Sequence, residues 1–165
     1  MANRYPNIIN NIPQKQTTQQ DSGSSGSLPL STFKSLGNIT TPYGGNTRDE
    51  GFHPGVDVAN AIGTKIPAMT SGQVVDKSEG HQQGEKNGGN YVIIKDEKGN
   101  EHRYSHLNRA YVKVGQYVKA GTPLGEMGNS GNTYSDSGGT GSHLDYRIVS
   151  TLGKYINPSD YLRKS

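Results

Sequence analysis

Residues 90–107 read NYVIIKDEKGNEHRYSHL and contain the clearest secondary-structure signal in the chain. Tyr91–Ile94 and Glu101–Leu107 are short runs rich in β-branched and aromatic residues, which favour strands. The polar segment between them, Lys95–Asn100 (KDEKGN), is typical of a hairpin turn. The stretch therefore predicts two neighbouring antiparallel strands.

Similar short runs recur on both sides of this hairpin. Gly, Asn, Asp or Pro punctuates nearly every gap between them, and a helical repeat is only weakly visible, near Ser31–Leu36. The pattern predicts an all-β fold, a small antiparallel sheet or two-layer β-sandwich with long loops. The other expected strands are Val56–Ala59, Val74-Val75, Tyr111–Val114 and Leu144–Val149.

The chain divides into a polar leader and one domain. Residues 1–30 are rich in Asn, Gln, Thr and Ser, and Ser22–Ser27 (SGSSGS) has the composition of a flexible linker. We therefore expect a flexible tail over residues 1–30 and a domain over residues 31–165. The apolar patches Ile8-Ile9 and Leu28–Leu30 leave two alternatives open for the tail, a solvated leader or a strap that docks on a partner.

Composition excludes several classes of site. The 165 residues include no cysteine, so any metal must be held by His, Asp or Glu. The formal charge is +3 and the cations are scattered, a weak pattern for nucleic-acid binding, which we do not expect. No run approaches the ~18 apolar residues of a membrane span, and Met1–Asn11 has no apolar core of a secretory signal. We therefore expect delivery by another route.

Two short motifs pair a histidine with an aspartate. In HPGVD, His53 precedes Asp57 by four residues, and a turn through the Pro-Gly pair can bring both side chains to one point. In SHLDY, His143 and Asp145 lie two residues apart, so both project from the same face of a strand. Nitrogen and oxygen donors of this kind suit Zn²⁺, although each pair alone is also common on exposed surfaces.

The remaining histidines lie on a loop and in the second strand of the hairpin. Strand alternation places His102, Tyr104 and His106 on one face, with His106 at the strand end as a candidate general base. The alternative for His106 is a half-exposed strand residue. His81 and His102 are expected to be exposed.

Taken in order, these segments resemble the M23 family of peptidoglycan endopeptidases, of the lysostaphin and LytM type. The resemblance covers most of residues 36–162, beginning at Ile39–Gly44 (ITTPYG) and ending at Asn157-Pro158. Several motifs in one order make it far more specific than any single motif. The segments that carry it are HPGVD (53–57), GTKIPAMTSGQVV (63–75), YSHL (104–107), VKVGQYVKAGTPLGEMGNSG (112–131) and SHLDYRI (142–148).

The resemblance implies a zinc metalloendopeptidase that cleaves peptide cross-links of peptidoglycan. By position, it assigns one zinc ion per chain to His53, Asp57 and Asp145, and catalytic roles to His106 and His143. Asp145 is a departure, because the family normally has a second histidine there. Aspartate is a competent zinc ligand, but a second carboxylate makes the centre less positive. This predicts weaker activity or a preference for another divalent ion.

A second departure and three functional alternatives remain open. The segment Asn129–Gly141 is longer than the family's usual link, and is either a rim that touches substrate or a surface insertion. The domain is expected to act at the bacterial cell wall on peptidoglycan, as an enzyme. It could instead be a catalytically weak or inactive wall-binding or regulatory module. A third alternative is a part of a phage particle, attached to a virion or tail partner through residues 1–30 and released with it or by lysis.

Overall fold

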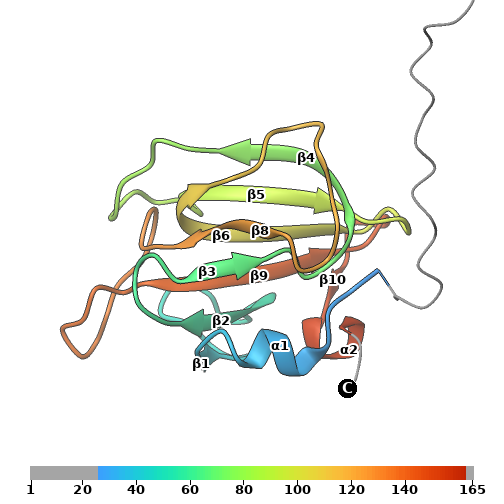
Figure 1. Ribbon diagram of the computed structural model, residues 1–165. Coiled ribbons are helices and arrows are strands. Elements are labelled where there is room, and N and C mark those ends of the chain that lie inside the picture. Colours follow the sequence, from blue (N-terminus) through green and yellow to red (C-terminus); the bar gives the residue numbers. More distant parts are fainter. Residues whose placement is uncertain (1–25, 163–165) are drawn as a thin grey trace, which may run out of the picture.

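The computed structural model describes residues 26–162, so most of the predicted tail, residues 1–25, lies outside the described part of the chain. Ten strands form a single antiparallel sheet system, and two short helices accompany it (Figure 1). The elements are α1 (Leu30–Lys34), β1 (Asn38–Thr41), β2 (Gly55–Ala59), β3 (Lys65–Pro67), β4 (Gly72–Ser78), β5 (Asn90–Lys95), β6 (Glu101–Ala110), β7 (Tyr117–Val118), β8 (Pro123–Met127), β9 (His143–Val149), β10 (Tyr155–Ile156) and α2 (Pro158–Tyr161).

The predicted hairpin lies at the centre of the main sheet. The strands follow the order β1-β2-β9-β6-β5-β4-β7, and β10 pairs with β9. β3 and β8 pair with each other, and Figure 1 shows them in front of β6 and β9 as a second layer. The predicted all-β antiparallel fold is confirmed.

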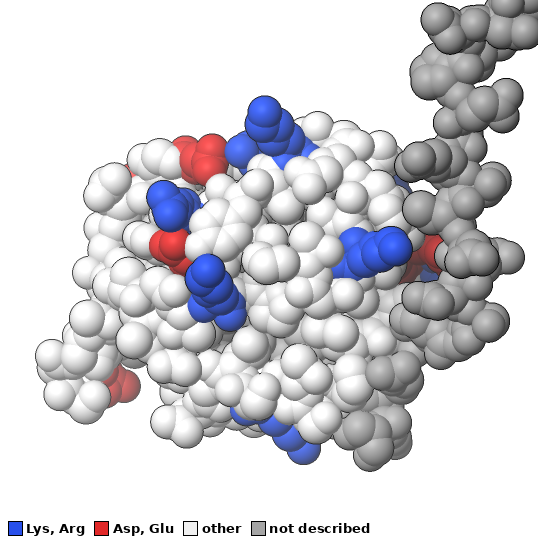
Figure 2. All heavy atoms as spheres, in the orientation of Figure 1, with Lys and Arg blue, Asp and Glu red and all other residues white. Residues whose placement is uncertain are grey.

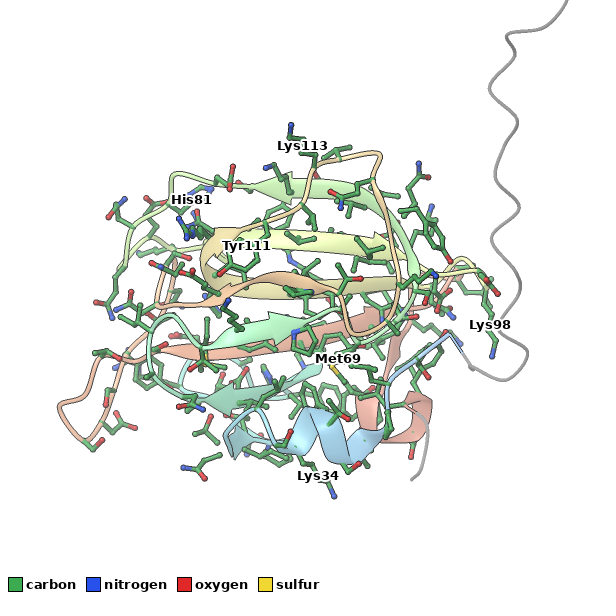
Figure 3. The ribbon with its side chains drawn as sticks, in the orientation of Figure 1. Lys34, Met69, His81, Lys98, Tyr111 and Lys113 are labelled. Carbon is green, nitrogen blue, oxygen red and sulfur yellow. The ribbon has the colours of Figure 1, made fainter. Side chains whose placement is uncertain are left out.

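Strand alternation separates a buried face of the sheet from a face that carries polar groups. Leu144, Tyr146 and Ile148 are fully buried on one face of β9, whereas His143 and Asp145 project from the other face, as predicted. Figure 3 shows Met69 inside the molecule between the sheet and α1. Cutting a large side chain of this core to alanine costs about 2–5 kcal/mol. Other fully buried members are Phe33, Ile66, Ile94, Tyr104, Leu107, Leu124 and Met127.

β6 bends sharply at His106. This residue has φ 65°, the only positive φ among the non-glycine residues of the described chain. β6 pairs with β9 up to Ser105 and with β5 up to Leu107, with a register shift across His106, and from Leu107 onward it also pairs with β8. The prediction that His102, Tyr104 and His106 share a face is therefore wrong for His106. The left-handed residue breaks the alternation and turns its ring to the polar face.

The prediction that His102 is exposed is also wrong. Its side chain is fully buried, with Nε2 2.9 Å from Asp96 Oδ2 and Nδ1 2.7 Å from the Tyr146 hydroxyl. The hydroxyl of Tyr161, from α2, also donates to Asp96. Asp96 belongs to the turn between β5 and β6, where Figure 3 labels Lys98. This turn packs near α2, so tertiary contacts bury a residue that an isolated hairpin would expose.

Smaller differences concern the ends of the elements. The expected strand Tyr111–Val114 is absent, because β6 ends at Ala110 and the chain then turns toward β7. α1 begins one residue before the weak helical signal over residues 31–36 and overlaps its first four residues. The last residues of the predicted tail lie against the domain, where the Leu28 amide donates to the Met69 carbonyl at 2.8 Å. Leu28 and Leu30 pack against the core.

The surface charge and the helices bear on the predicted partners. Figure 2 shows Lys, Arg, Asp and Glu in small groups separated by uncharged surface on the face in view. Over residues 26–162, neither helix has the length and apolar character needed to cross a membrane. His81 lies on the loop after β4 (Figure 3), where it is partly exposed and contacts Ser78 and Glu85.

Candidate metal centre

A polar groove of about 1400 Å³ lies on the face of the sheet opposite the core. Its floor is built from three adjacent strands, because Asp57 on β2 is in register with Asp145 on β9, and Asp145 with Ser105 on β6. His106 and His143 also line the groove. Four of the five predicted site residues thus come from central strands, and His53 joins them from the turn before β2.

Three of these side chains converge on one point. His53 Nε2 lies 3.0 Å from Asp57 Oδ1 and 3.8 Å from Asp145 Oδ1. One donor atom from each residue lies within 4.8 Å of the other two, and all three residues are buried. Gly55 permits the approach of the strands, because a Cβ there would meet Asp145 Oδ1 at 2.8 Å and Arg147 Cγ at 2.7 Å.

Two of these donor atoms lie in contact but form no aligned hydrogen bond. In the described part of the chain, three buried side-chain atoms have no hydrogen-bond partner, and two of them are His53 Nε2 and Asp57 Oδ1. The third, Ser142 Oγ, belongs to the residue beside His143. Buried polar groups are nearly always paired. The imidazole of His53 faces the carboxylate of Asp57, and the carboxylate of Asp145 lies beside them. This set of donors suits a tetrahedral cation such as Zn²⁺.

Glu50 orients the His53 ring. Its carboxylate lies 3.0 Å from His53 Nδ1, so Nδ1–H donates to it and Nε2 is left for the candidate metal. Burial lowers the pKa of His53, but the contact with Asp57, the hydrogen bond with Glu50 and the charge of Asp145 outweigh it and raise the pKa to about 9. The carboxylates around this ring therefore favour a positive charge on the ring itself. The motif analysis did not identify Glu50, although it lies only three residues before His53.

Arg147 holds Asp145 in place. Its Nε lies 3.0 Å from each Asp145 oxygen, and its terminal Nη2 lies 2.6 Å from Oδ2 and 3.2 Å from Glu50 Oε1. Burial raises the pKa of Asp145, but the hydrogen bonds and charge of Arg147 outweigh this and lower it. Arg147 was also not identified from the motif, although alternation places it on the same strand face as Asp145.

The two other histidines are anchored by the same ring atom. His106 Nδ1 donates to the Ser130 carbonyl at 2.7 Å, and His143 Nδ1 donates to the Gly141 carbonyl at 2.8 Å. Because a carbonyl can only accept, each Nδ1 carries a proton, and in the neutral form of each ring Nε2 is the acceptor. The ring centroids are 4.6 Å apart, and His143 Nε2 lies 3.9 Å from Asp57 Oδ1.

The strained backbone at His106 is supported by two loops. The His106 amide donates to the Gly88 carbonyl at 2.9 Å, and Ser130 Oγ donates to the Leu107 carbonyl at 2.7 Å. A left-handed conformation in a residue with a side chain is costly and persists only where its surroundings impose it. Burial of the ring, with the nearby charge of His143, lowers the pKa of His106, which keeps this ring neutral.

The segment Asn129–Gly141 forms part of the groove wall. The Arg48 guanidinium lies 3.5 Å above the ring centroid of Tyr134, and Asn132 donates to Asp49 at 2.9 Å. These contacts join the segment to the loop that precedes His53. The segment Asn129–Gly141 is therefore tied to the groove rather than isolated on the surface.

Residues 51–158 match the sequence profile of Peptidase family M23. The chain belongs to this family. It is 37% identical to lysostaphin of Staphylococcus simulans over 119 residues, and 39% identical to the peptidoglycan DD-endopeptidase ShyA of Vibrio cholerae over 108 residues. It is also 30% identical over 138 residues to the murein hydrolase activator NlpD of Escherichia coli.

These M23 relatives are much longer than the region they share with this chain. The matches cover 70%, 64% and 82% of this chain, but only 22%, 22% and 32% of lysostaphin, ShyA and NlpD. Among solved structures, lysostaphin aligns with a TM-score of 0.65 and 27% identity, over 85% of this chain and 54% of that chain. A variant of the catalytic domain of the prophage-encoded M23 protein EnpA of Enterococcus faecalis aligns with a TM-score of 0.61 and 31% identity. The alignment covers 83% of this chain and 98% of that chain.

Proposed function

We propose that this domain is a zinc-dependent endopeptidase that hydrolyses peptide cross-links in bacterial peptidoglycan. The observation that carries the proposal is the convergence of three buried donor atoms, His53 Nε2, Asp57 Oδ1 and Asp145 Oδ1, of which the first two form no aligned hydrogen bond. A cation at this point would take all three donor atoms as ligands, and membership of family M23 supports the same reading.

His53, Asp57 and Asp145 would hold the metal. Zinc bound by three protein ligands supplies a Lewis acid that polarises a carbonyl oxygen and lowers the pKa of water. Because two of the three ligands are carboxylates, the centre is less positive than one with two histidines and one carboxylate. Another divalent ion therefore stays an alternative as the native metal.

His106 and His143 would act directly on the reactants. With each Nδ1 proton committed to a backbone carbonyl, each Nε2 can accept a proton from the attacking water. Once protonated, the same Nε2–H can donate to the oxyanion of the tetrahedral intermediate and then to the leaving amine. Their close rings allow one histidine to accept the proton while the other orients the carbonyl oxygen.

The segment Asn129–Gly141 would contact substrate along the groove wall. Its contacts with Arg48 and Asp49 hold it beside the loop that leads into His53. Tyr134→Ala should then raise KM for wall fragments more than it lowers kcat, because it removes part of the wall and none of the reacting groups. Unchanged KM and kcat would make the segment a surface insertion.

Metal content and wall cleavage test the proposal together. Elemental analysis of the purified chain should find about one zinc per chain, and isolated cell walls should release peptides. The matched variant Asp145→Asn, which keeps the shape and removes the charge, should lose both. Absence of metal and of cleavage in the natural chain, with both gained in Asp145→His, would refute the proposal.

A second candidate function is a non-catalytic module that regulates wall hydrolysis. The hydrogen bonds from Arg147 to both oxygens of Asp145 favour this second function, because a guanidinium can take the place of a metal ion beside a carboxylate. NlpD, one of the relatives, is named a murein hydrolase activator. Under this alternative the chain would bind peptidoglycan in a pull-down yet contain no metal, and Arg147→Gln would not impair wall binding.

We also infer that the domain acts at the bacterial cell wall and that a phage particle could carry it there. The likeness to a prophage-encoded M23 protein supports this route. Residues 1–30 would then attach the domain to a virion partner. Size-exclusion chromatography of the full chain and of residues 26–165 with candidate tail proteins tests the attachment, which should require residues 1–25.

A further inference from the structure

Two arginines face each other across neighbouring strands in the floor of the groove. Arg103 on β6 is in register with Arg147 on β9, and both line the groove. Like charges directly opposite each other in a sheet are destabilising. Each guanidinium therefore needs a group that offsets its charge. An arginine that finds no such group in the chain is a candidate for binding an anionic ligand.

Only one of the two arginines is neutralised. Arg147 forms ion pairs with Asp145 at 2.6 Å and with Glu50 at 3.2 Å. Arg103 forms no ion pair with any residue between 26 and 162. Glu101, two positions earlier on the same strand, instead lies 3.7 Å from Lys95.

The guanidinium of Arg103 is nevertheless held in a defined position. Its Nε donates to Ser105 Oγ at 3.2 Å, and its central carbon lies 4.2 Å from the ring centroid of Tyr91. The Tyr91 hydroxyl is itself fixed by Asp76 at 2.9 Å. These contacts engage one edge and one face of the guanidinium. They leave its two terminal nitrogens without a partner in the described chain.

One of those terminal nitrogens lies beside the loop that supports His106. A Cβ placed on Gly88 would meet Arg103 Nη2 at 3.1 Å, and the Gly88 carbonyl is the one that accepts the His106 amide. Tyr104 and Ser105 separate Arg103 from His106 in the sequence, and Ser105 lies opposite Asp145. A peptide bound at His106 would therefore pass within reach of the Arg103 fork.

We propose that Arg103 binds a free carboxylate of the substrate and thereby selects anionic stem peptides over chains of glycine. A guanidinium presents two parallel N–H groups that match a carboxylate, and a partly desolvated site strengthens the pair. A direct cross-link to diaminopimelate carries such a carboxylate beside the bond, whereas a glycine bridge does not. This inference rests on the proposed peptidoglycan endopeptidase function and specifies its substrate.

The test uses two synthetic D-alanyl–diaminopimelate cross-linked peptides that differ only in one group, the free carboxylate or its carboxamide, with a glycine-bridged peptide as third substrate. The natural chain should cleave the carboxylate form with a kcat/KM about 10–100-fold above the carboxamide. Arg103→Gln should reduce this ratio to near one, and Arg103→Lys should keep part of it. Arg109→Gln is the matched control, since it removes a cation from the same strand outside the groove, and its ratio should equal that of the natural chain.

The possible outcomes separate this inference from the proposed function. A ratio that stays high in Arg103→Gln, or a natural chain without preference, overturns the role of Arg103. If the natural chain cleaves none of the peptides, the endopeptidase proposal fails. Fluorescence anisotropy of the same labelled peptides then measures the preference as a ratio of Kd values. That ratio must again fall in Arg103→Gln, with thermal melting showing that the variant is folded.

Discussion

The guanidinium of Arg147 donates hydrogen bonds to both carboxylate oxygens of Asp145, from Nε at 3.0 Å and from Nη2 at 2.6 Å. Asp145 is the candidate ligand at which this chain departs from the M23 pattern of two histidines. Arg147 therefore controls the orientation of the least usual donor in the site. It also brings a positive charge close to the point where a metal cation would bind. The orientation of Asp145 favours metal binding, whereas this charge repels the metal.

The first prediction concerns how these two effects of Arg147 balance in the affinity for zinc. Arg147→Gln should weaken zinc binding about 10–100-fold, the usual loss when an outer partner of a metal ligand is removed. We expect orientation to outweigh repulsion, because Glu50 already neutralises part of the guanidinium charge. Competition of the chain with a zinc-sensitive dye measures the Kd directly.

The control for Arg147→Gln is a variant that removes an arginine lying away from the candidate metal site. Arg109→Gln removes an exposed guanidinium that pairs with Glu126 and lies over the Tyr111 ring, and it should leave the zinc Kd unchanged. Tighter zinc binding by Arg147→Gln would contradict the prediction. It would show that the guanidinium occupies the position of the cation, as the regulatory alternative requires.

The second prediction separates catalysis from metal binding at His106. His106→Ala should lower kcat about 10²–10⁴-fold, because it removes a group that transfers the proton. Zinc content should not change, since the ring is not among the three converging donors. His81→Ala, on a loop outside the groove, is the matched histidine control. Equal loss of zinc and turnover in His106→Ala would instead make His106 part of the metal centre.

The third prediction tests the support of the strained His106 backbone. Gly89 has φ 64°, and a Cβ there would lie 2.4 Å from the Ser130 carbonyl group that anchors the His106 ring. Gly89→Ala should cost about 1–3 kcal/mol of unfolding free energy beyond the backbone strain, and it should lower turnover by displacing the ring.

Gly84 provides the comparison for Gly89. It also has a positive φ, 91°, but a Cβ there would meet nothing within 4 Å. Gly84→Ala should therefore show only the backbone cost, about 1 kcal/mol in urea denaturation, with turnover retained. Equal effects of the two substitutions would mean that the contact with Ser130 does not matter.

The fourth prediction is the pH dependence of stability from His102. Burial lowers the pKa of this ring in the folded chain, whereas the unfolded chain keeps a value near 6.5. The unfolded state therefore binds more protons, so stability is fully present above pH 6.5 and falls as the pH drops below it. The slope is at most about 1.4 kcal/mol per pH unit. Urea denaturation from pH 8 to pH 5 measures it.

A variant isolates the part that His102 plays. His102→Asn removes the titrating ring, so the difference in unfolding free energy between it and the natural chain should shrink as the pH falls from 6.5 toward 5. Using the difference cancels the titration of the other histidines. A difference that stays constant over this range would show that His102 takes up its proton in the folded chain as readily as in the unfolded chain.

Local sequence determined the strands and several facing relationships. The runs around residues 90–107 predicted the central hairpin, because β-branched residues flanking a polar turn favour that structure whatever surrounds it. Alternation placed His143 and Asp145 on one face of β9, and the same rule could have added Arg147. Close spacing could have added Glu50. The motif order also identified the family before any contact was known.

Tertiary structure decided what alternation cannot express. His106 faces the groove because two loops impose a positive φ on it, and His102 is buried because α2 packs near the turn that contains Asp96. Arg103 and Arg147 lie side by side only after β6 pairs with β9. These relationships join residues that are distant along the chain. They depend on which strands pair and where a strand bends, which no short segment specifies by itself.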